Sequence, residues 1–153
     1  EIRATFGDCV IAENGALDRA RLREIVFADD ARRTELEGIL HPRIRDAALA
    51  QAAAAEGPYV VIVVPLLFES PMRRAMDRIL VVDCDEETQL RRLTARDDEN
   101  EAQARRIIAA QASREERLSI ANDVIANEGD LRDTRNAVAA LHQSYLELTN
   151  SAA

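Results

Sequence analysis

The chain of 153 residues has the length of a single domain, and its hydrophobic content of 47% is sufficient for a buried core. Its formal net charge of −8 lacks the positive surface that binding to a nucleic-acid duplex requires, so we expect no nucleic-acid partner. The longest apolar run, residues 59–68, is too short to cross a bilayer, and we expect no membrane association.

The first third of the chain is predicted to be helical. Asn14-Gly15 is a turn signal, and apolar residues then recur at helical spacing at positions 17, 22, 25 and 26. A second helix is expected over residues 31–40. Because proline is favoured in a first helical turn, Pro42 predicts the start of a third helix that runs to residue 55. Gly57-Pro58 ends this helix.

Three apolar segments predict strands. Residues 59–64 are almost all β-branched and do not alternate with polar residues, as is typical of a strand buried on both faces of a parallel sheet. Residues 79–82 repeat this pattern, and residues 123–125 form a third, weaker segment. A last helix follows, with an apolar stripe at Leu131, Val138, Leu141, Tyr145 and Leu148. Strands that alternate with helices predict an α/β fold with a parallel sheet.

Residues 86–121, between the second and third predicted strands, are helical in character and rich in arginine. One interpretation is a solvated helical hairpin with i,i+4 ion pairs. The other concerns Arg92 and Arg96, which are four residues apart and therefore share a helix face. They follow a strand whose carboxyl end would face a ligand crevice, where two guanidinium groups can bind a polyphosphate. Asp83 or Asp85 is expected to cap the first of these helices.

All 20 basic residues are arginines, and the chain contains no lysine. A composition bias explains this by itself, but the chemical consequence is the same: phosphate binding by these residues has to use arginine or backbone N–H groups. Two cysteines, Cys9 and Cys84, form no C-x-x-C pair, and no signal peptide opens the chain. These features favour a reducing cytoplasm over a secreted location.

Several segments together resemble the dephospho-CoA kinase family, in the order and spacing of that family and over nearly the whole chain. They are residues 6–7 (FG), 14–19 (NGALDR), 22–27 (LREIVF), 40–44 (LHPRI), 64–70 (VPLLFES), 89–93 (QLRRL), 96–97 (RD), 108–111 (IAAQ), 113–118 (SREERL) and 123–127 (DVIAN). Each segment alone is a weak signal, but their combination is specific.

The resemblance implies a three-layer, P-loop kinase-like α/β fold: a parallel sheet with a helical substrate domain and a helical lid. On this basis we expect a mainly helical, CoA-binding region at residues 1–58 and core strands within residues 59–85. The lid is expected at residues 86–121, and the last core strand with its C-terminal helix at residues 122–153.

The resemblance also implies an enzyme, a phosphotransferase of coenzyme A biosynthesis that transfers the γ-phosphoryl group of ATP to the ribose 3′-hydroxyl of dephospho-CoA. Its partners would be dephospho-CoA and ATP, with Mg²⁺. Arg92 and Arg96 would be catalytic lid arginines that stabilise the transferring phosphoryl group. Arg92, Arg114 and Asn127 would bind the nucleotide.

His41, Pro65, Leu66 and Phe68 would contact the substrate. For His41, a structural cap is an equally good interpretation. For Leu66 and Phe68, a position in the wall or core of the protein is the better interpretation. No residue is expected to bind a metal directly.

The family begins with a strand, a G-x-x-x-x-G-K-[ST] loop with its helix, and a second strand, and none of these is found in the 153 residues. We therefore expect that the first strands and the P-loop are missing, that ligands for Mg²⁺ lie in the missing part, and that the chain by itself is inactive. The alternative is a non-catalytic module that binds CoA or dephospho-CoA. Two further departures are Ala126 and Asn122, where aspartate is common in the family.

Overall fold

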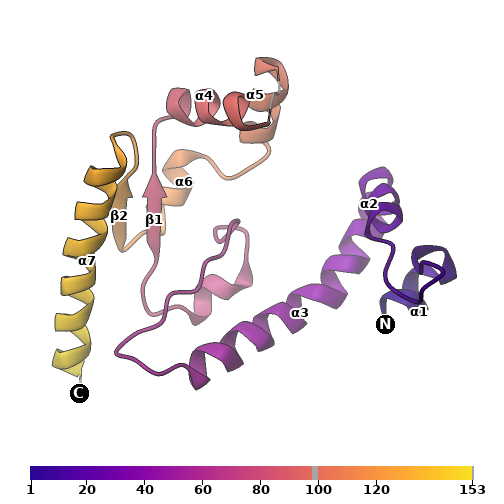
Figure 1. The fold of residues 1–153 in the computed structure, drawn as a ribbon, viewed down its shortest axis with the longest axis horizontal. Helices are drawn as coiled ribbons and strands as arrows, with labels where there is room; N and C mark the ends of the chain where they lie inside the picture. Colours follow the sequence, from indigo (N-terminus) through magenta and orange to yellow (C-terminus); the bar gives the residue numbers. More distant parts are fainter. Residues whose placement is uncertain (98–99, 153) are drawn as a thin grey trace. The chain divides into compact units, whose positions relative to one another are not determined.

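A computed structural model describes residues 1–97 and 100–152, which form two compact units, residues 1–56 and 57–153 (Figure 1). The first unit contains α1 (Ile2–Phe6), the short 3-10 helix η1 (Asp8–Val10), α2 (Arg19–Ala28) and α3 (Asp30–Ala54). The second contains η2 (Pro71–Ala75), β1 (Leu80–Asp83), α4 (Glu86–Asp97), α5 (Glu101–Ala109), α6 (Arg114–Ser119), β2 (Asp123–Ala126) and α7 (Leu131–Ala152).

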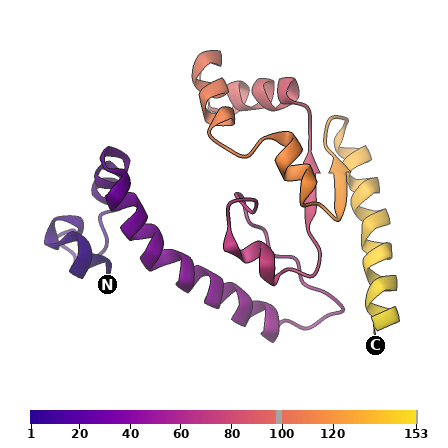
Figure 2. The ribbon, with the colours of Figure 1, turned by 180° about the vertical axis from the view of Figure 1, so that it is seen from behind.

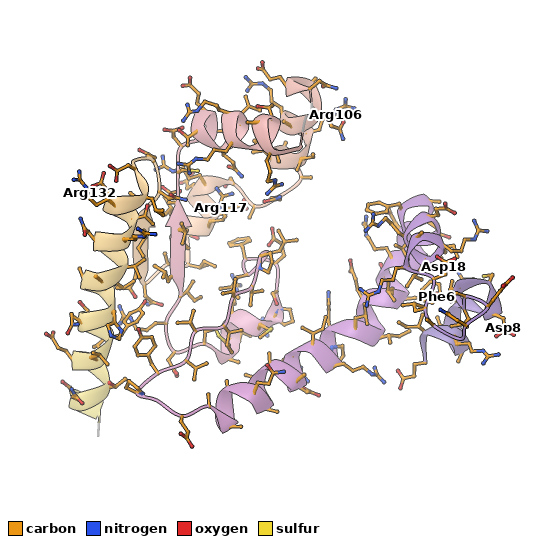
Figure 3. The ribbon with its side chains drawn as sticks, viewed as in Figure 1. Phe6, Asp8, Asp18, Arg106, Arg117 and Arg132 are labelled. Carbon is orange, nitrogen blue, oxygen red and sulfur yellow. The ribbon has the colours of Figure 1, made fainter. Side chains whose placement is uncertain are left out.

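The first unit packs α1, η1 and α2 around a small apolar core of Phe6, Val10 and Leu22. The predicted turn is present, because Gly15 has a φ of 79° and its N–H donates to the Ala12 carbonyl oxygen at 2.8 Å. Glycine occupies this left-handed region without the strain that a Cβ would cause. The predicted helix that follows is α2, and it is capped by Asp18, whose side chain accepts a hydrogen bond from the Arg21 N–H at 2.9 Å (Figure 3).

The boundary predicted at Pro42 is wrong, because α3 is one continuous helix of 25 residues with Pro42 inside it. An interior proline removes one backbone hydrogen bond and costs about 3 kcal/mol. The helix α3 has other stabilising contacts. Its N-terminus is capped by the Asp29 side chain, which accepts from Ala31 and Arg32, and in the proline turn Arg43 Nη1 donates to the Ile39 carbonyl oxygen at 2.7 Å.

The second unit is built on a parallel pair of strands, β1 and β2, in which Leu80 lies opposite Asp123 and Asp83 opposite Ala126. The crossover between the two strands carries α4, α5 and α6. Figures 1 and 2 show the strands side by side, with α7 alongside β2, and α7 contacts β2 as α6 contacts β1. An α/β unit with helices against a small parallel sheet is therefore present, as the alternation of apolar segments and helices predicted.

The strand predicted at residues 59–64 is not formed. The segment belongs to no sheet, and Val61 and Val63 are 66% and 85% exposed. A strand requires a backbone neighbour that pairs with its N–H and C=O groups, and within residues 1–97 and 100–152 no segment pairs with this one. The core strands expected within residues 59–85 are thus reduced to β1. In the same ranges, no helix combines the length and the apolar character that crossing a membrane would need.

The amino end of the strand pair is held by Asp123, the first residue of β2. Arg78 donates from Nε and Nη2 to the two carboxylate oxygens of Asp123, each at 3.0 Å, and the Tyr145 hydroxyl of α7 donates to Asp123 Oδ2 at 2.9 Å. The Tyr59 ring packs edge-on against Tyr145, and its hydroxyl lies 2.6 Å from His142 Nδ1. These contacts fix α7 and the start of residues 59–64 to one end of β2.

Candidate functional site

The candidate site lies at the opposite end of the strand pair, where β1 and β2 finish. Asp83 is the last residue of β1, and only 6% of its surface is exposed. Its carbonyl oxygen accepts a hydrogen bond from the Asn127 N–H at 2.7 Å, which extends the strand pairing by one step beyond Ala126. Ligands of α/β proteins bind at the carboxyl ends of parallel strands, so this edge is where a substrate is expected.

Arg114 reaches this edge from the first position of α6. The helix starts with a capping box, in which the Ser113 hydroxyl accepts from the Glu116 N–H and the Glu116 carboxylate accepts from the Ser113 N–H. The start of α6 is therefore fixed. From there, Arg114 Nε donates to both Asp83 carboxylate oxygens at 3.1 and 3.0 Å, and Nη2 donates to Asp83 Oδ2 at 2.6 Å.

Arg92 reaches the same edge from α4. This helix is capped by Asp85, whose carboxylate accepts from the Thr88 N–H at 2.5 Å, and the Asp85 N–H in turn donates to Glu128 Oε1 at 3.1 Å. Of the two residues expected to cap α4, it is Asp85 that does so. Arg92 Nη1 donates to the Asn127 carbonyl oxygen at 2.6 Å. Asp83, Arg92, Arg114 and Asn127 thus form one connected group, the strand-end cluster.

The electrostatics of the strand-end cluster follow from these contacts. The hydrogen bonds from Thr88 are the main cause that lowers the pKa of Asp85, so Asp85 carries a negative charge at neutral pH. The bonds to Asp83 are the main cause that raises the pKa of Arg114, and Glu128 and Asp85 add to it. Arg114 is therefore surrounded by the carboxylates of Asp83, Asp85 and Glu128, while its own side chain is half exposed.

The remaining predicted site residues lie elsewhere. Arg96 is one turn beyond Arg92 on α4 and is exposed, as expected from their spacing. Pro65, Leu66 and Phe68 lie in a turn of the second unit; Leu66 is exposed, and Phe68 is half-buried with the Arg73 guanidinium 5.4 Å from its ring centre. His41 is exposed on α3 of the first unit. The structure therefore brings together Arg92, Arg114 and Asn127, and it places the others outside that group.

An open depression of about 620 Å³ lies between α4 and α5. It is lined by Glu86, Glu87, Leu90, Arg91, Thr94, Glu101 and Arg105. Three glutamates against two arginines make it a poor site for a phosphate, and none of the predicted site residues lines it. The strand-end cluster is the better candidate. Among the described residues, no group of three or more His, Cys, Asp or Glu side chains is arranged to hold a metal ion.

Sequence reasoning missed two contacts that involve this region. Asp83 was considered only as a helix cap, although an acidic residue directly after an apolar segment was a usable signal for the end of a buried strand. The second contact is at Ala112, between α5 and α6: its N–H donates to Glu69 Oε1 at 3.0 Å, and its carbonyl accepts from Arg117 Nη1 at 2.5 Å (Arg117 is labelled in Figure 3). No sequence pattern links Glu69 to Ala112, which are 43 residues apart.

The comparisons with known proteins agree with one another. A sequence model of the dephospho-CoA kinase family matches residues 1–133. A dephospho-CoA kinase of Burkholderia pseudomallei (strain K96243) is 49% identical over 153 residues, which cover 99% of this chain and 75% of the relative. A dephospho-CoA kinase of Thiobacillus denitrificans is 51% identical over 148 residues, covering 96% of this chain and 73% of the relative.

Two solved structures share the fold of this chain. A dephospho-CoA kinase from Campylobacter jejuni superposes with a TM-score of 0.69 at 26% identity, covering 99% of this chain and 76% of that one. A crystal structure from Thermus thermophilus superposes with a TM-score of 0.76 at 30% identity, covering 94% of this chain and 74% of that one.

Proposed function

The chain belongs to the dephospho-CoA kinase family, and from that premise we propose that it binds dephospho-CoA and ATP and serves to transfer the γ-phosphoryl group of ATP to the ribose 3′-hydroxyl, giving CoA and ADP. The observation that carries this proposal is the strand-end cluster. Three residues chosen from the sequence as nucleotide ligands, Arg92, Arg114 and Asn127, come from three different elements and meet at one edge of the sheet.

Arg92 and Arg114 supply what phosphoryl transfer asks of a protein, namely fixed positive charge beside the phosphates. Arg92 is held by a backbone carbonyl and Arg114 by a carboxylate, so both guanidinium groups are oriented before a nucleotide arrives. Arg96, one turn further along α4, is proposed as the second lid arginine. The turn with Pro65, Leu66 and Phe68, and His41 on α3, are proposed to contact dephospho-CoA.

ATP and Mg²⁺ are the reactants that the family implies. The exposed side of Arg114 suits a phosphate, but the described residues offer no cluster of oxygen ligands for Mg²⁺, and we derive no step through the metal. The 153 residues also contain no lysine and no G-x-x-x-x-G-K-[ST] loop. We propose that phosphoryl transfer depends on such a loop outside these residues, and that the 153 residues alone bind substrate without turnover. We also retain a cytoplasmic location, since Cys9 and Cys84 are free thiols.

The test is formation of CoA from dephospho-CoA and ATP, measured on the full-length protein and on the 153 residues separately. We expect turnover only from the full-length protein. Turnover by the 153 residues alone would disprove the need for an additional phosphate loop, and no turnover by the full-length protein would disprove the kinase function.

The alternative, a non-catalytic module that binds CoA or dephospho-CoA, is favoured by the absence of a phosphate loop from these residues. Calorimetry distinguishes it. A full-length protein that binds both ligands but produces no CoA would support the module, and one that binds neither would exclude it.

A further inference from the structure

Asp83 holds Arg114 by one edge of its guanidinium group only. An arginine side chain has two donor edges: one formed by Nε and Nη2, and an outer one formed by Nη1 and Nη2. The Asp83 carboxylate accepts at the first edge, at 2.6 to 3.1 Å. Arg114 Nη1 makes no hydrogen bond to any residue in the ranges 1–97 and 100–152, and half of the Arg114 side chain is exposed. The outer edge therefore remains available to a ligand.

The anchor of this arrangement is rigid. The Asp83 carboxylate is 7% exposed, and the residue lies in the strand ladder opposite Ala126. Its own carbonyl accepts from the Asn127 N–H, and the Asn127 carbonyl accepts from Arg92 Nη1. Through its side chain Asp83 thus orients the arginine of α6, and through its main chain it supports the turn that orients the arginine of α4.

A buried carboxylate next to a phosphate site reduces the local positive charge, so a purely electrostatic view would predict that it weakens phosphate binding. The geometry favours the opposite effect. A flexible arginine loses side-chain entropy when it binds, and one whose inner edge is already fixed loses less for each bond that it forms. A fixed outer edge also presents two parallel donors to two phosphate oxygens, which is the strongest form of this contact.

We infer that Asp83 is a positioning residue for nucleotide binding: its carboxylate fixes the inner edge of the Arg114 guanidinium, so that the outer edge donates to the phosphate oxygens of ATP. This inference rests on the proposed function. It goes beyond that proposal by assigning part of the affinity for ATP to a buried carboxylate, which acts through its hydrogen bonds to Arg114.

The chain offers a matched control in Asp123, at the other end of the sheet. Its carboxylate likewise accepts from Nε and Nη2 of one arginine, Arg78, but it accepts from the Tyr145 hydroxyl of α7 as well. The substitutions Asp83→Asn and Asp123→Asn each remove one negative charge from such a pair, so their loss of folding stability should be similar. Only Asp83→Asn should change ATP binding.

The experiment measures the dissociation constant of ATP by calorimetry, and the KM of ATP and kcat of CoA formation, on the full-length protein. We expect Asp83→Asn to weaken ATP binding about tenfold and Asp123→Asn to leave it within about twofold. The KM of dephospho-CoA should not change in either variant. In an Arg114→Ala background, Asp83→Asn should have no further effect on ATP binding, because the two residues act as one unit.

Two results would overturn the inference: equal ATP affinity in the wild type and Asp83→Asn, or an unchanged effect of Asp83→Asn after Arg114 is removed. If Asp83→Asn does not fold, the variant Arg114→Lys is measured instead. Lysine keeps the positive charge at this half-exposed position but lacks the second donor edge of a guanidinium group. ATP binding by Arg114→Lys equal to that of the wild type would refute the positioning role of Asp83. If the wild type binds ATP, and Asp83→Asn weakens that binding as expected, but no CoA is formed, the kinase function is refuted and the inference stands. Absence of ATP binding by the wild type would refute both.

Discussion

The two ends of the strand pair use the same kind of ion pair for different purposes. At the amino end, Asp123 accepts from Arg78 and also from Tyr145 of α7, so its carboxylate joins two segments of the fold. At the carboxyl end, Asp83 accepts from Arg114 alone among the side chains of the described residues, and the outer edge of that arginine remains exposed. What distinguishes the two ends is the second partner of the carboxylate: Asp123 also accepts from Tyr145 of α7, whereas among the described residues no side chain other than Arg114 donates to Asp83.

An arginine–carboxylate pair therefore does not by itself tell whether a region binds a ligand or stabilises the fold. At the amino end, Tyr145 packs against the ring of Tyr59, whose hydroxyl lies beside His142. The carboxyl end is surrounded by the starts of α4 and α6 and by the turn after β2, which are all places where backbone N–H groups and side chains point outward. We therefore expect substitutions at the two ends to separate catalysis from stability.

The largest effect is expected from Arg92→Ala at the carboxyl end. Because Arg92 is proposed to stabilise the transferring phosphoryl group, its removal should lower kcat of the full-length protein by about 100-fold or more, with a smaller change in the KM of ATP. The corresponding change at the amino end, Arg78→Ala, should leave kcat within about twofold. Steady-state rates of CoA formation test both, and a near-normal kcat for Arg92→Ala would contradict its assigned role.

The next effect is on stability at the amino end. Asp123→Ala removes the acceptor of Arg78 and of the Tyr145 hydroxyl together, so the contact between α7 and β2 loses its polar part. We expect the thermal midpoint to fall by about 5 °C, while kcat at a temperature well below that midpoint stays normal. Differential scanning calorimetry and rate measurements on the same preparation test this. A loss of kcat without a loss of stability would mean that the two ends are not separable.

Acid should remove the stabilisation that the Asp123 carboxylate gives to the amino end of the strand pair. Arg78, with a further contribution from Tyr145, lowers the pKa of Asp123 in the folded protein below the ordinary aspartate value of about 3.9. A lowered folded pKa stabilises the protein above the unfolded pKa, and this stabilisation is lost as the pH falls through the folded pKa. The stability difference between the wild type and Asp123→Asn should therefore be constant near neutral pH and shrink below about pH 4. Urea unfolding at several pH values measures it, and a difference that persists at about pH 2 would exclude this origin.

The parts of the fold that depend on local sequence were predictable. The turn at Gly15, the helix α2 with its apolar spacing, the strands β1 and β2 and the long α7 all follow from patterns within about ten residues. The errors at Pro42 and at residues 59–64 have non-local causes. Pro42 does not mark a helix start, because α3 already begins at the Asp29 cap well before it. A strand-forming segment forms no strand, because pairing depends on a neighbour that its own residues cannot specify.

The candidate site shows the same limit. Arg92, Arg114 and Asn127 were chosen through resemblance, and the structure shows that they meet. The residue that hydrogen-bonds to both Arg114 and Asn127 is Asp83, and the sequence did not indicate this because the Arg114 partner lies 31 residues away. Asn122, one of the two departures from the family pattern, also has a local explanation: its side-chain oxygen accepts from the Ile79 N–H at 2.8 Å, at the amino end and away from the strand-end cluster.

The smallest effect is expected at the junction of α5 and α6, which tests whether the carboxyl end is coupled to the turn around residues 65–69. Glu69→Ala leaves the Ala112 N–H without its carboxylate acceptor, whereas Arg117 still holds the Ala112 carbonyl. An exposed hydrogen bond contributes little, so we expect a change of about threefold in the KM of both ATP and dephospho-CoA, with kcat retained. Glu115→Ala is the control, because it removes an exposed carboxylate of α6 that makes no hydrogen bond to the described residues. If only the KM of dephospho-CoA changes, Glu69 acts within its own turn and the junction does not link the two substrates. If the KM of ATP and the KM of dephospho-CoA change together, the contact at Ala112 connects the strand-end cluster to the turn proposed to bind dephospho-CoA.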